Sequence, residues 1–140
     1  RLIVVTNQSG IARGLIRPEA YELVRRRLDA LLADHGGVLD GVYVCPHHPS
    51  ITGPCDCRKP GLALYRQAAA EHDLDFARSV FLGDKPSDVD PARALGGRAI
   101  LVRTGYGRTS EGAVDASAEV ADDFAHAVEL VLGTGAAAGP

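Results

Sequence analysis

Four short, continuous apolar runs alternate with segments of helical periodicity along this 140-residue chain. The runs cover residues 2–5, 42–44, 80–82 and 100–102. Runs of this length are typical of strands that are buried on both faces, and such strands joined by helices form parallel sheets. The alternation therefore predicts an α/β fold, with a parallel sheet between two layers of helices.

The segments between the runs carry helix signals. Pro18 suits the first turn of a helix, apolar residues recur at helical spacing over 21–32, and the glycine pair at 36–37 ends the pattern. Further helices are expected in three places: from the Pro60-Gly61 pair, from an N-cap at Asp88, and over residues 122–132.

The length suits one domain with a single core. We expect this domain over residues 1–132, followed by a mobile tail of small residues over 133–140. The sequence contains no Met and its first apolar run starts already at residue 2, so we expect it to be a piece of a longer protein.

Composition excludes several classes of partner. The formal charge is −3, from 15 basic and 18 acidic residues, and Trp is absent. A strongly basic nucleic-acid binder is excluded by this charge. No apolar run approaches the length of about 20 residues that a membrane span requires. We expect a monomer that contacts neither nucleic acid nor membrane.

All three cysteines fall within residues 45–57. An odd number cannot form a complete set of disulfides. Cys45, Cys55 and Cys57 with one imidazole would make the closed tetrahedral set that structural zinc prefers. His47 and His48 compete for the fourth place, and we favour His47, which pairs Cys-x-His with Cys-x-Cys. Reduced thiols or a strained local disulfide are the alternatives, and a thiolate zinc site fits the reducing cytoplasm.

Polar residues follow each predicted strand, where open parallel sheets bind their ligands. Asp84 ends the third run and could hold Mg²⁺, with Asp88 one turn further on to orient a ligand or a lysine. The alternative is an ordinary helix N-terminus, where Asp is favoured for capping alone.

Two other polar groups are suited to a phosphoryl group. Thr6 ends the first run, and the residues after it offer amides and polar side chains: Asn7, Gln8 and Ser9. Arg58 and Lys59 directly follow the cysteine loop, which would fix their position. A simple turn and a solvated basic pair are the alternative interpretations.

Together these segments resemble the haloacid-dehalogenase (HAD) superfamily of phosphatases. Three phrases in the right order carry the resemblance: the TNQSGIARG of residues 6–14, the Cys-x-His…Cys-x-Cys-Arg-Lys-Pro loop of 45–60, and the Gly-Asp-Lys of 83–85. They are most similar to the D-glycero-D-manno-heptose 1,7-bisphosphate phosphatases, and less so to the histidinol-phosphatases. A polynucleotide phosphatase shares the Thr-Asn-Gln phrase, but the acidic balance and few aromatics disfavour it.

The resemblance implies a Rossmann-like core with a zinc-stapled loop, a small phosphorylated sugar as substrate, and a role for each matching residue. Thr6 would hydrogen-bond the phosphoryl group and Lys59 would balance its charge. Asp84 would bind Mg²⁺ with support from Asp88. The implied substrate contacts are Asn7, Gln8, Ser9, Arg58, Lys59 and Lys85. The implied zinc ligands are Cys45, His47, Cys55 and Cys57.

The sequence departs from the family at its first motif, an Asp-x-Asp at the end of an N-terminal strand, which supplies the nucleophile. Only five residues precede Thr6, and the Asp pairs at 73–75 and 88–90 do not follow a strand in the needed way. We therefore expect the 140 residues alone to be inactive, the complete enzyme forming an aspartyl-phosphate. Histidinol phosphate or another small phosphomonoester is the alternative substrate. A catalytically inactive, zinc-stapled module that binds a phosphosugar or a protein is the alternative function.

Overall fold

The computed structural model describes residues 1–133, which divide into two compact units. Unit 1 is Arg1–Leu74 and unit 2 begins at Asp75. Of the tail expected over 133–140, only Gly133 belongs to the described residues, as the C-cap of the last helix. The other tail residues, 134–140, lie outside them.

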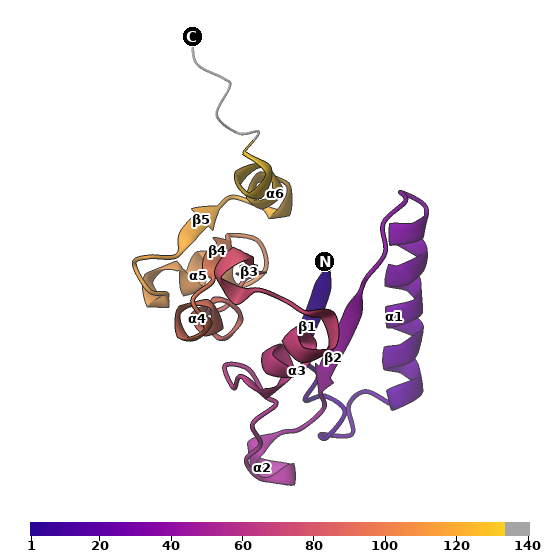
Figure 1. Ribbon diagram of the computed structural model, residues 1–140. Helices are drawn as coiled ribbons and strands as arrows, with labels where there is room; N and C mark the ends of the chain where they lie inside the picture. The colour runs from indigo at the N-terminus through magenta and orange to yellow at the C-terminus, as the bar shows by residue number, and fades with distance from the viewer. Residues whose placement is uncertain (134–140) are drawn as a thin grey trace. The chain divides into compact units, whose positions relative to one another are not determined.

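Unit 1 is a two-stranded parallel sheet with three helices (Figure 1). Its elements are β1 (Ile3–Asn7), α1 (Pro18–Ala33), β2 (Gly41–Cys45), α2 (Pro49–Thr52) and α3 (Ala63–His72). The register pairs Ile3 with Gly41 and Asn7 with Cys45, so the carboxyl ends of β1 and β2 are level. The segments that follow the two strands therefore leave the sheet side by side.

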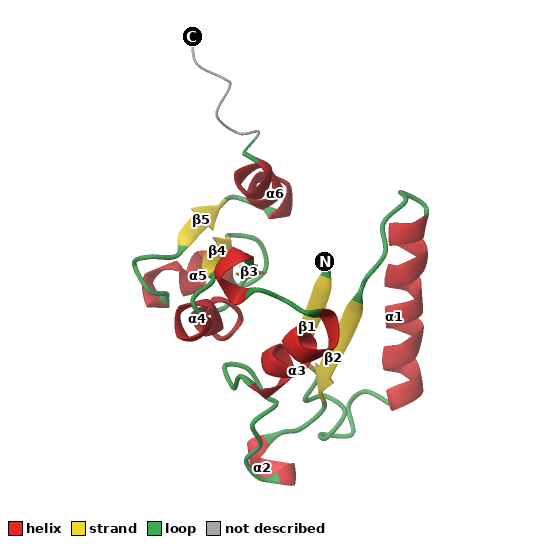
Figure 2. Ribbon diagram, viewed as in Figure 1, coloured by secondary structure: helices red, strands yellow, loops and turns green. Residues whose placement is uncertain are grey.

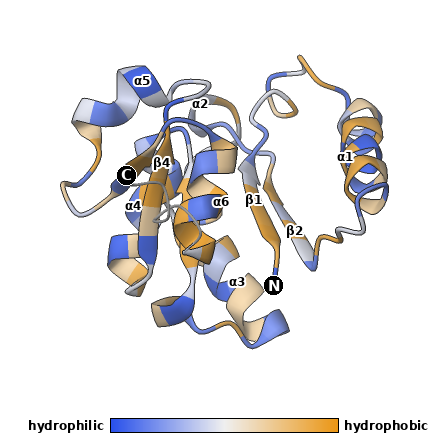
Figure 3. Cartoon of the chain, turned by 90° about the horizontal axis from the view of Figure 1, so that it is seen from above, coloured by the Kyte–Doolittle hydropathy of each residue, from blue (hydrophilic) through white to orange (hydrophobic). Residues whose placement is uncertain are grey.

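The core of unit 1 lies between the sheet and α3. Tyr43 and Cys45 of β2 are buried against Leu64 and Ala68 of α3. The predicted helix from Pro18 is confirmed as α1, but it contains no buried residue. Figure 3 shows hydrophobic and hydrophilic residues on α1.

Unit 2 is a three-stranded parallel sheet in the order β3-β4-β5 (Figure 2). Its elements are η1 (Phe76–Arg78), β3 (Val80–Gly83), α4 (Pro86–Leu95), β4 (Arg98–Val102), α5 (Gly107–Ser110), η2 (Glu111–Ala113), β5 (Glu119–Ala121) and α6 (Phe124–Leu132). The central strand β4 supplies the fully buried Ile100 and Leu101, as its apolar sequence requires. Ile100 packs with Ala121 of β5 and Ala127 of α6.

The α/β fold with parallel strands is confirmed, and every strand and helix expected from the sequence is present. The expected cap of α4 is wrong. The helix begins at Pro86 with Lys85 as its N-cap, while Asp88 is the third helical residue and accepts a hydrogen bond from the Lys85 N–H at 3.1 Å. Pro at the first helical position fixes this earlier start, since its ring already has a helical φ.

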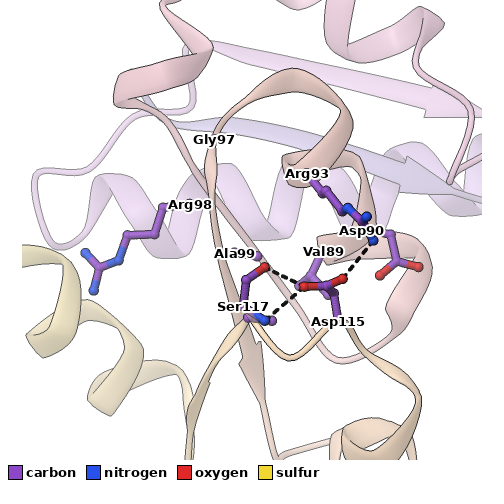
Figure 4. A pocket seen from close by; sticks show the side chains of 9 residues that line it. Val89, Asp90, Arg93, Gly97, Arg98, Ala99, Asp115 and Ser117 are labelled. Carbon is purple, nitrogen blue, oxygen red and sulfur yellow. Dashed lines mark hydrogen bonds and ion pairs between the residues drawn. The ribbon is translucent and has the colours of Figure 1, made fainter.

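Unit 2 also contains a small cavity of about 140 Å³ between α4, the start of β4 and the segment before β5 (Figure 4). Three of its polar residues, Arg93, Asp115 and Ser117, bind one another. Asp115 accepts hydrogen bonds from Arg93 at 2.8 Å and from the Ser117 hydroxyl at 2.6 Å. None of the site residues expected from the sequence lines this cavity.

Within residues 1–133, no helix combines the length and the apolar content that crossing a membrane would need.

Candidate functional site

Three thiols and one imidazole converge in unit 1. The ligand atoms of Cys45, His47, Cys55 and Cys57 all lie within 4.8 Å of one another. The Cys57 Sγ lies 3.0 Å from the Cys45 Sγ, 3.4 Å from the Cys55 Sγ and 3.2 Å from the His47 Nδ1. The three cysteines are free thiols in the structure.

The sheet and the loop each supply part of this cluster. Cys45 is the last residue of β2 and is fully buried, so the sheet fixes its sulfur. His48 does not belong to the cluster; its Nδ1 accepts the Ser50 N–H at 3.3 Å and caps α2. The structure therefore brings His47 to the thiols and gives His48 a local structural role.

The donor set fits a structural zinc ion. Three sulfurs and one ring nitrogen fill a tetrahedral site and leave no position for water. Burial opposes ionisation of Cys55, but hydrogen bonds from Cys57 and its other neighbours lower the pKa of Cys55 to about 7. Burial and the neighbouring sulfurs raise the pKa of Cys57. A bound cation would favour the thiolate form of Cys57 as well, because metal ligation and deprotonation of a thiol are coupled.

The carboxyl end of β1 presents a hydroxyl that is already oriented. The Gln8 Nε2 donates a hydrogen bond to the Thr6 Oγ1 at 3.0 Å. Because the oxygen accepts this bond, the Thr6 hydroxyl keeps its own hydrogen for another acceptor. Ser9 lies in the turn that follows, where its carbonyl accepts the Arg13 N–H.

Lys59 is tied to β1 at its main chain and at its ammonium group. The Asn7 Oδ1 accepts the Lys59 N–H at 3.0 Å, and the Asn7 Nδ2 donates to the Lys59 carbonyl at 3.2 Å. The Lys59 Nζ donates to the Val5 carbonyl at 2.6 Å. The Arg58 guanidinium reaches the His47 carbonyl at 3.4 Å. Unit 1 thus gathers Thr6, the two cations and the metal ligands around the ends of its two strands.

Unit 2 gathers the remaining predicted residues at the end of β3. The Asp84 Oδ2 accepts the Tyr106 N–H at 2.8 Å. The Lys85 ammonium lies 3.9 Å from the centroid of the Tyr106 ring. Gly105, at φ +61°, allows this approach, since a Cβ there would lie 2.3 Å from the Asp84 Oδ2.

Gly105 and Tyr106 were not singled out from the sequence. The only available signal was their place in the segment after the β4 strand end. Gly83 is a second position without room for a side chain, because a Cβ there would lie 2.3 Å from the Asp88 Cβ.

Neither Asp-x-Asp pair lies at the end of a strand. Asp73 is the left-handed C-cap of α3, and Asp75 caps η1 by accepting the Ala77 N–H at 2.9 Å. Asp88 and Asp90 both lie within α4. The structure thus places none of these four carboxylates at the carboxyl end of a strand.

Comparison with known proteins gives a consistent result. A model of the HAD-hydrolase-like family matches residues 56–127. The D-glycero-β-D-manno-heptose-1,7-bisphosphate 7-phosphatase of Yersinia pestis is 44% identical over 117 residues, which are 79% of this chain and 62% of that protein. The protein of the same name from Bordetella bronchiseptica is 35% identical over 133 residues, covering 94% of this chain and 73% of its own length.

A solved structure is also similar. The D,D-heptose 1,7-bisphosphate phosphatase of B. bronchiseptica, crystallised with magnesium and phosphate, matches with a TM-score of 0.86 and 34% identity. The match covers 94% of this chain and 74% of that one. This chain spans less than two thirds of the length of the Yersinia relative.

Proposed function

The chain belongs to the HAD-hydrolase-like family, and on that premise we propose that it carries the phosphoryl-binding and metal-binding parts of a magnesium-dependent phosphomonoesterase. The proposed substrate is D-glycero-D-manno-heptose 1,7-bisphosphate, from which the 7-phosphate is removed. The names of its relatives support this substrate. The observation that carries the proposal is the attachment of Lys59 to the strand that ends in Thr6 and Asn7.

In unit 1, Thr6 would donate its hydroxyl hydrogen to a phosphoryl oxygen, and Lys59 would neutralise the charge of the transferring group. Arg58 suits bidentate recognition of phosphate or hydroxyl groups. Asn7, through its main chain, and the side chains of Gln8 and Ser9 would complete the substrate contacts.

In unit 2, Asp84 would hold Mg²⁺ and Lys85 would contact the substrate. Mg²⁺ is bound in proteins by one or two carboxylates together with waters and substrate phosphates, and it neutralises the phosphoryl oxygens when bound. Asp84 fits this part, because the Tyr106 N–H occupies one of its oxygens and leaves further lone pairs. Asp88 would support the site through the Lys85 main chain.

Zinc, on this proposal, is structural. The cluster would staple the loop between β2 and α3, and thereby fix Arg58 and Lys59, which directly follow Cys57. Three cysteines that stay reduced fit a reducing compartment, which supports the cytoplasm as the location. We further propose that residues 1–132 are the HAD-like phosphatase domain, and that the protein acts as a monomer without nucleic-acid or membrane partners.

The substrate is tested on the chain extended ahead of Arg1 by the family's strand that ends in Asp-x-Asp. We expect this extended chain to release phosphate from the heptose bisphosphate with a kcat/KM at least tenfold above that for histidinol phosphate. Colorimetric release of phosphate measures both. Equal or reversed preference would overturn the heptose assignment and leave the phosphatase class standing.

The magnesium site is tested by Gly105→Ala. We expect Mg²⁺ affinity to fall about tenfold, since the added Cβ displaces the Asp84 carboxylate and costs roughly 1.4 kcal/mol of binding. Gly96→Ala is the matched control: Gly96 also has a positive φ, of +81°, but a Cβ there meets nothing within 4 Å. Isothermal titration with Mg²⁺ should separate the two variants, and equal affinities would remove Asp84 from the site.

A further inference from the structure

We propose that Asn7 is a positioning residue, whose side chain acts on the phosphoryl group only through Lys59. This inference rests on the proposed role of Lys59 and adds a residue to it. It differs from the direct substrate contact that the resemblance implies for the Asn7 side chain.

Both ends of the Asn7 amide are occupied by one residue. Its oxygen accepts the Lys59 N–H at 3.0 Å, and its nitrogen donates to the Lys59 carbonyl at 3.2 Å. Both hydrogen bonds are partly buried and join residues 52 positions apart in the chain. Two bonds to the same residue fix the orientation of the Lys59 main chain as well as its distance from the strand.

Asn7 is itself held by the sheet. It is the last residue of β1 and is paired in register with Cys45 of β2. The loop that carries Lys59 has no strand or helix between α2 and α3. The Asn7 side chain therefore holds this irregular segment in place against the sheet.

The ammonium of Lys59 depends on this anchor. Its Nζ lies 2.6 Å from the Val5 carbonyl, two residues before Asn7 on the same strand. With the main chain fixed by Asn7, the ammonium is held at β1, on the residue that precedes Thr6. Without the amide, the Lys59 N–H and carbonyl lose their partners on the strand, and the segment gains alternative positions.

The test is a double-variant cycle on the full 140-residue chain, with inorganic phosphate as the probe and binding followed by NMR titration. We expect Asn7→Ala to weaken phosphate binding about tenfold, as the loss of one to two hydrogen bonds would. The Asn7→Ala/Lys59→Ala double variant should bind no more weakly than Lys59→Ala alone, because Asn7 acts only through Lys59. Additive losses would mean a direct contact and overturn the inference.

Hydrogen exchange at the Lys59 amide gives a second readout that requires no phosphate. We expect faster exchange in Asn7→Ala, and retained protection in Asn7→Asp, which keeps the acceptor oxygen. Gln67→Ala is the matched control, since this amide bonds Glu71 on α3 at 2.8 Å and should leave both readouts unchanged.

The roles of Lys59 and of Asn7 are tested separately. If Lys59→Ala leaves phosphate affinity unchanged, the proposed function of Lys59 falls, and the inference with it. If Lys59→Ala weakens binding and Asn7→Ala does not, only the inference is overturned. Unaltered exchange at Lys59 in Asn7→Ala would also overturn it.

Discussion

We expect the 140-residue chain to release no phosphate from heptose bisphosphate above the uncatalysed rate, even with Mg²⁺ present. The extended chain, with the family's Asp-x-Asp strand ahead of Arg1, should turn over. Enzymes commonly accelerate such reactions by at least about 10⁶-fold, so the contrast should be all or none.

The physical reason lies in where the aspartates stand. An aspartyl nucleophile has to be placed in line with the phosphoryl group, and the resemblance implies a strand end as its place. Asp75 is engaged in capping η1, and Asp88 in bonding the Lys85 N–H. Thr6 and Lys59 can stabilise a phosphoryl group, but neither supplies a carboxylate that attacks it.

Asp84→Asn separates the interpretations of this experiment. In the extended chain it should abolish turnover. Turnover by the 140 residues alone that is lost in Asp84→Asn would show that a nucleophile lies among them and that we have misplaced it. An inactive extended chain that still binds phosphate would favour the non-catalytic binding module.

The second large effect is on the metal cluster. We expect about one zinc per chain in the unmodified protein and none retained in Cys57→Ser after dialysis. Structural zinc in small peptides binds with roughly 10–16 kcal/mol at neutral pH, so losing one of four ligands lowers affinity by orders of magnitude. Cys57 should be the most sensitive position, since its sulfur lies within 3.4 Å of the other three ligand atoms.

Metal content by mass spectrometry and hydrogen exchange over residues 58–59 measure this result. Exchange there should rise in Cys57→Ser, because these residues directly follow the lost ligand. His48→Ala is the control, since His48 caps α2 and should leave the zinc content unchanged. Unchanged zinc content in Cys57→Ser would show that this cluster does not bind the zinc.

The sequence predicted those strands whose apolar runs are continuous, because burial on both faces leaves a local signature. It missed β5, whose three residues are Glu119, Val120 and Ala121. That strand depends on its partner: Ala121 is buried beside Ile100, and Glu119 pairs with Arg98 of β4 at 2.8 Å. Long-range pairing of this kind has no local pattern to detect.

In the candidate site, too, local features could be predicted from the sequence and long-range contacts could not. The spacing of the cysteines sufficed to predict the cluster, and the strand ends sufficed to place Thr6 and Asp84. The hydrogen bonds between Asn7 and Lys59 could not be predicted, because they join residues far apart in the chain. The start of α4 after Lys85 was missed because Asp88 is the better capping residue type, while Pro86 determines where the helix starts.

The loop between Cys45 and Cys55 determines where this protein can accept changes in length. Cys45 belongs to the sheet, whereas Cys55 and Cys57 lie at the other end of the loop, after the nine residues 46–54. The cysteines hold both ends of this loop in place. The exposed α2 lies between them and supplies neither a ligand of the cluster nor a partner of Lys59. Insertions and deletions at α2 should therefore be tolerated, so this segment can acquire new contacts without a change in the chemistry beside it.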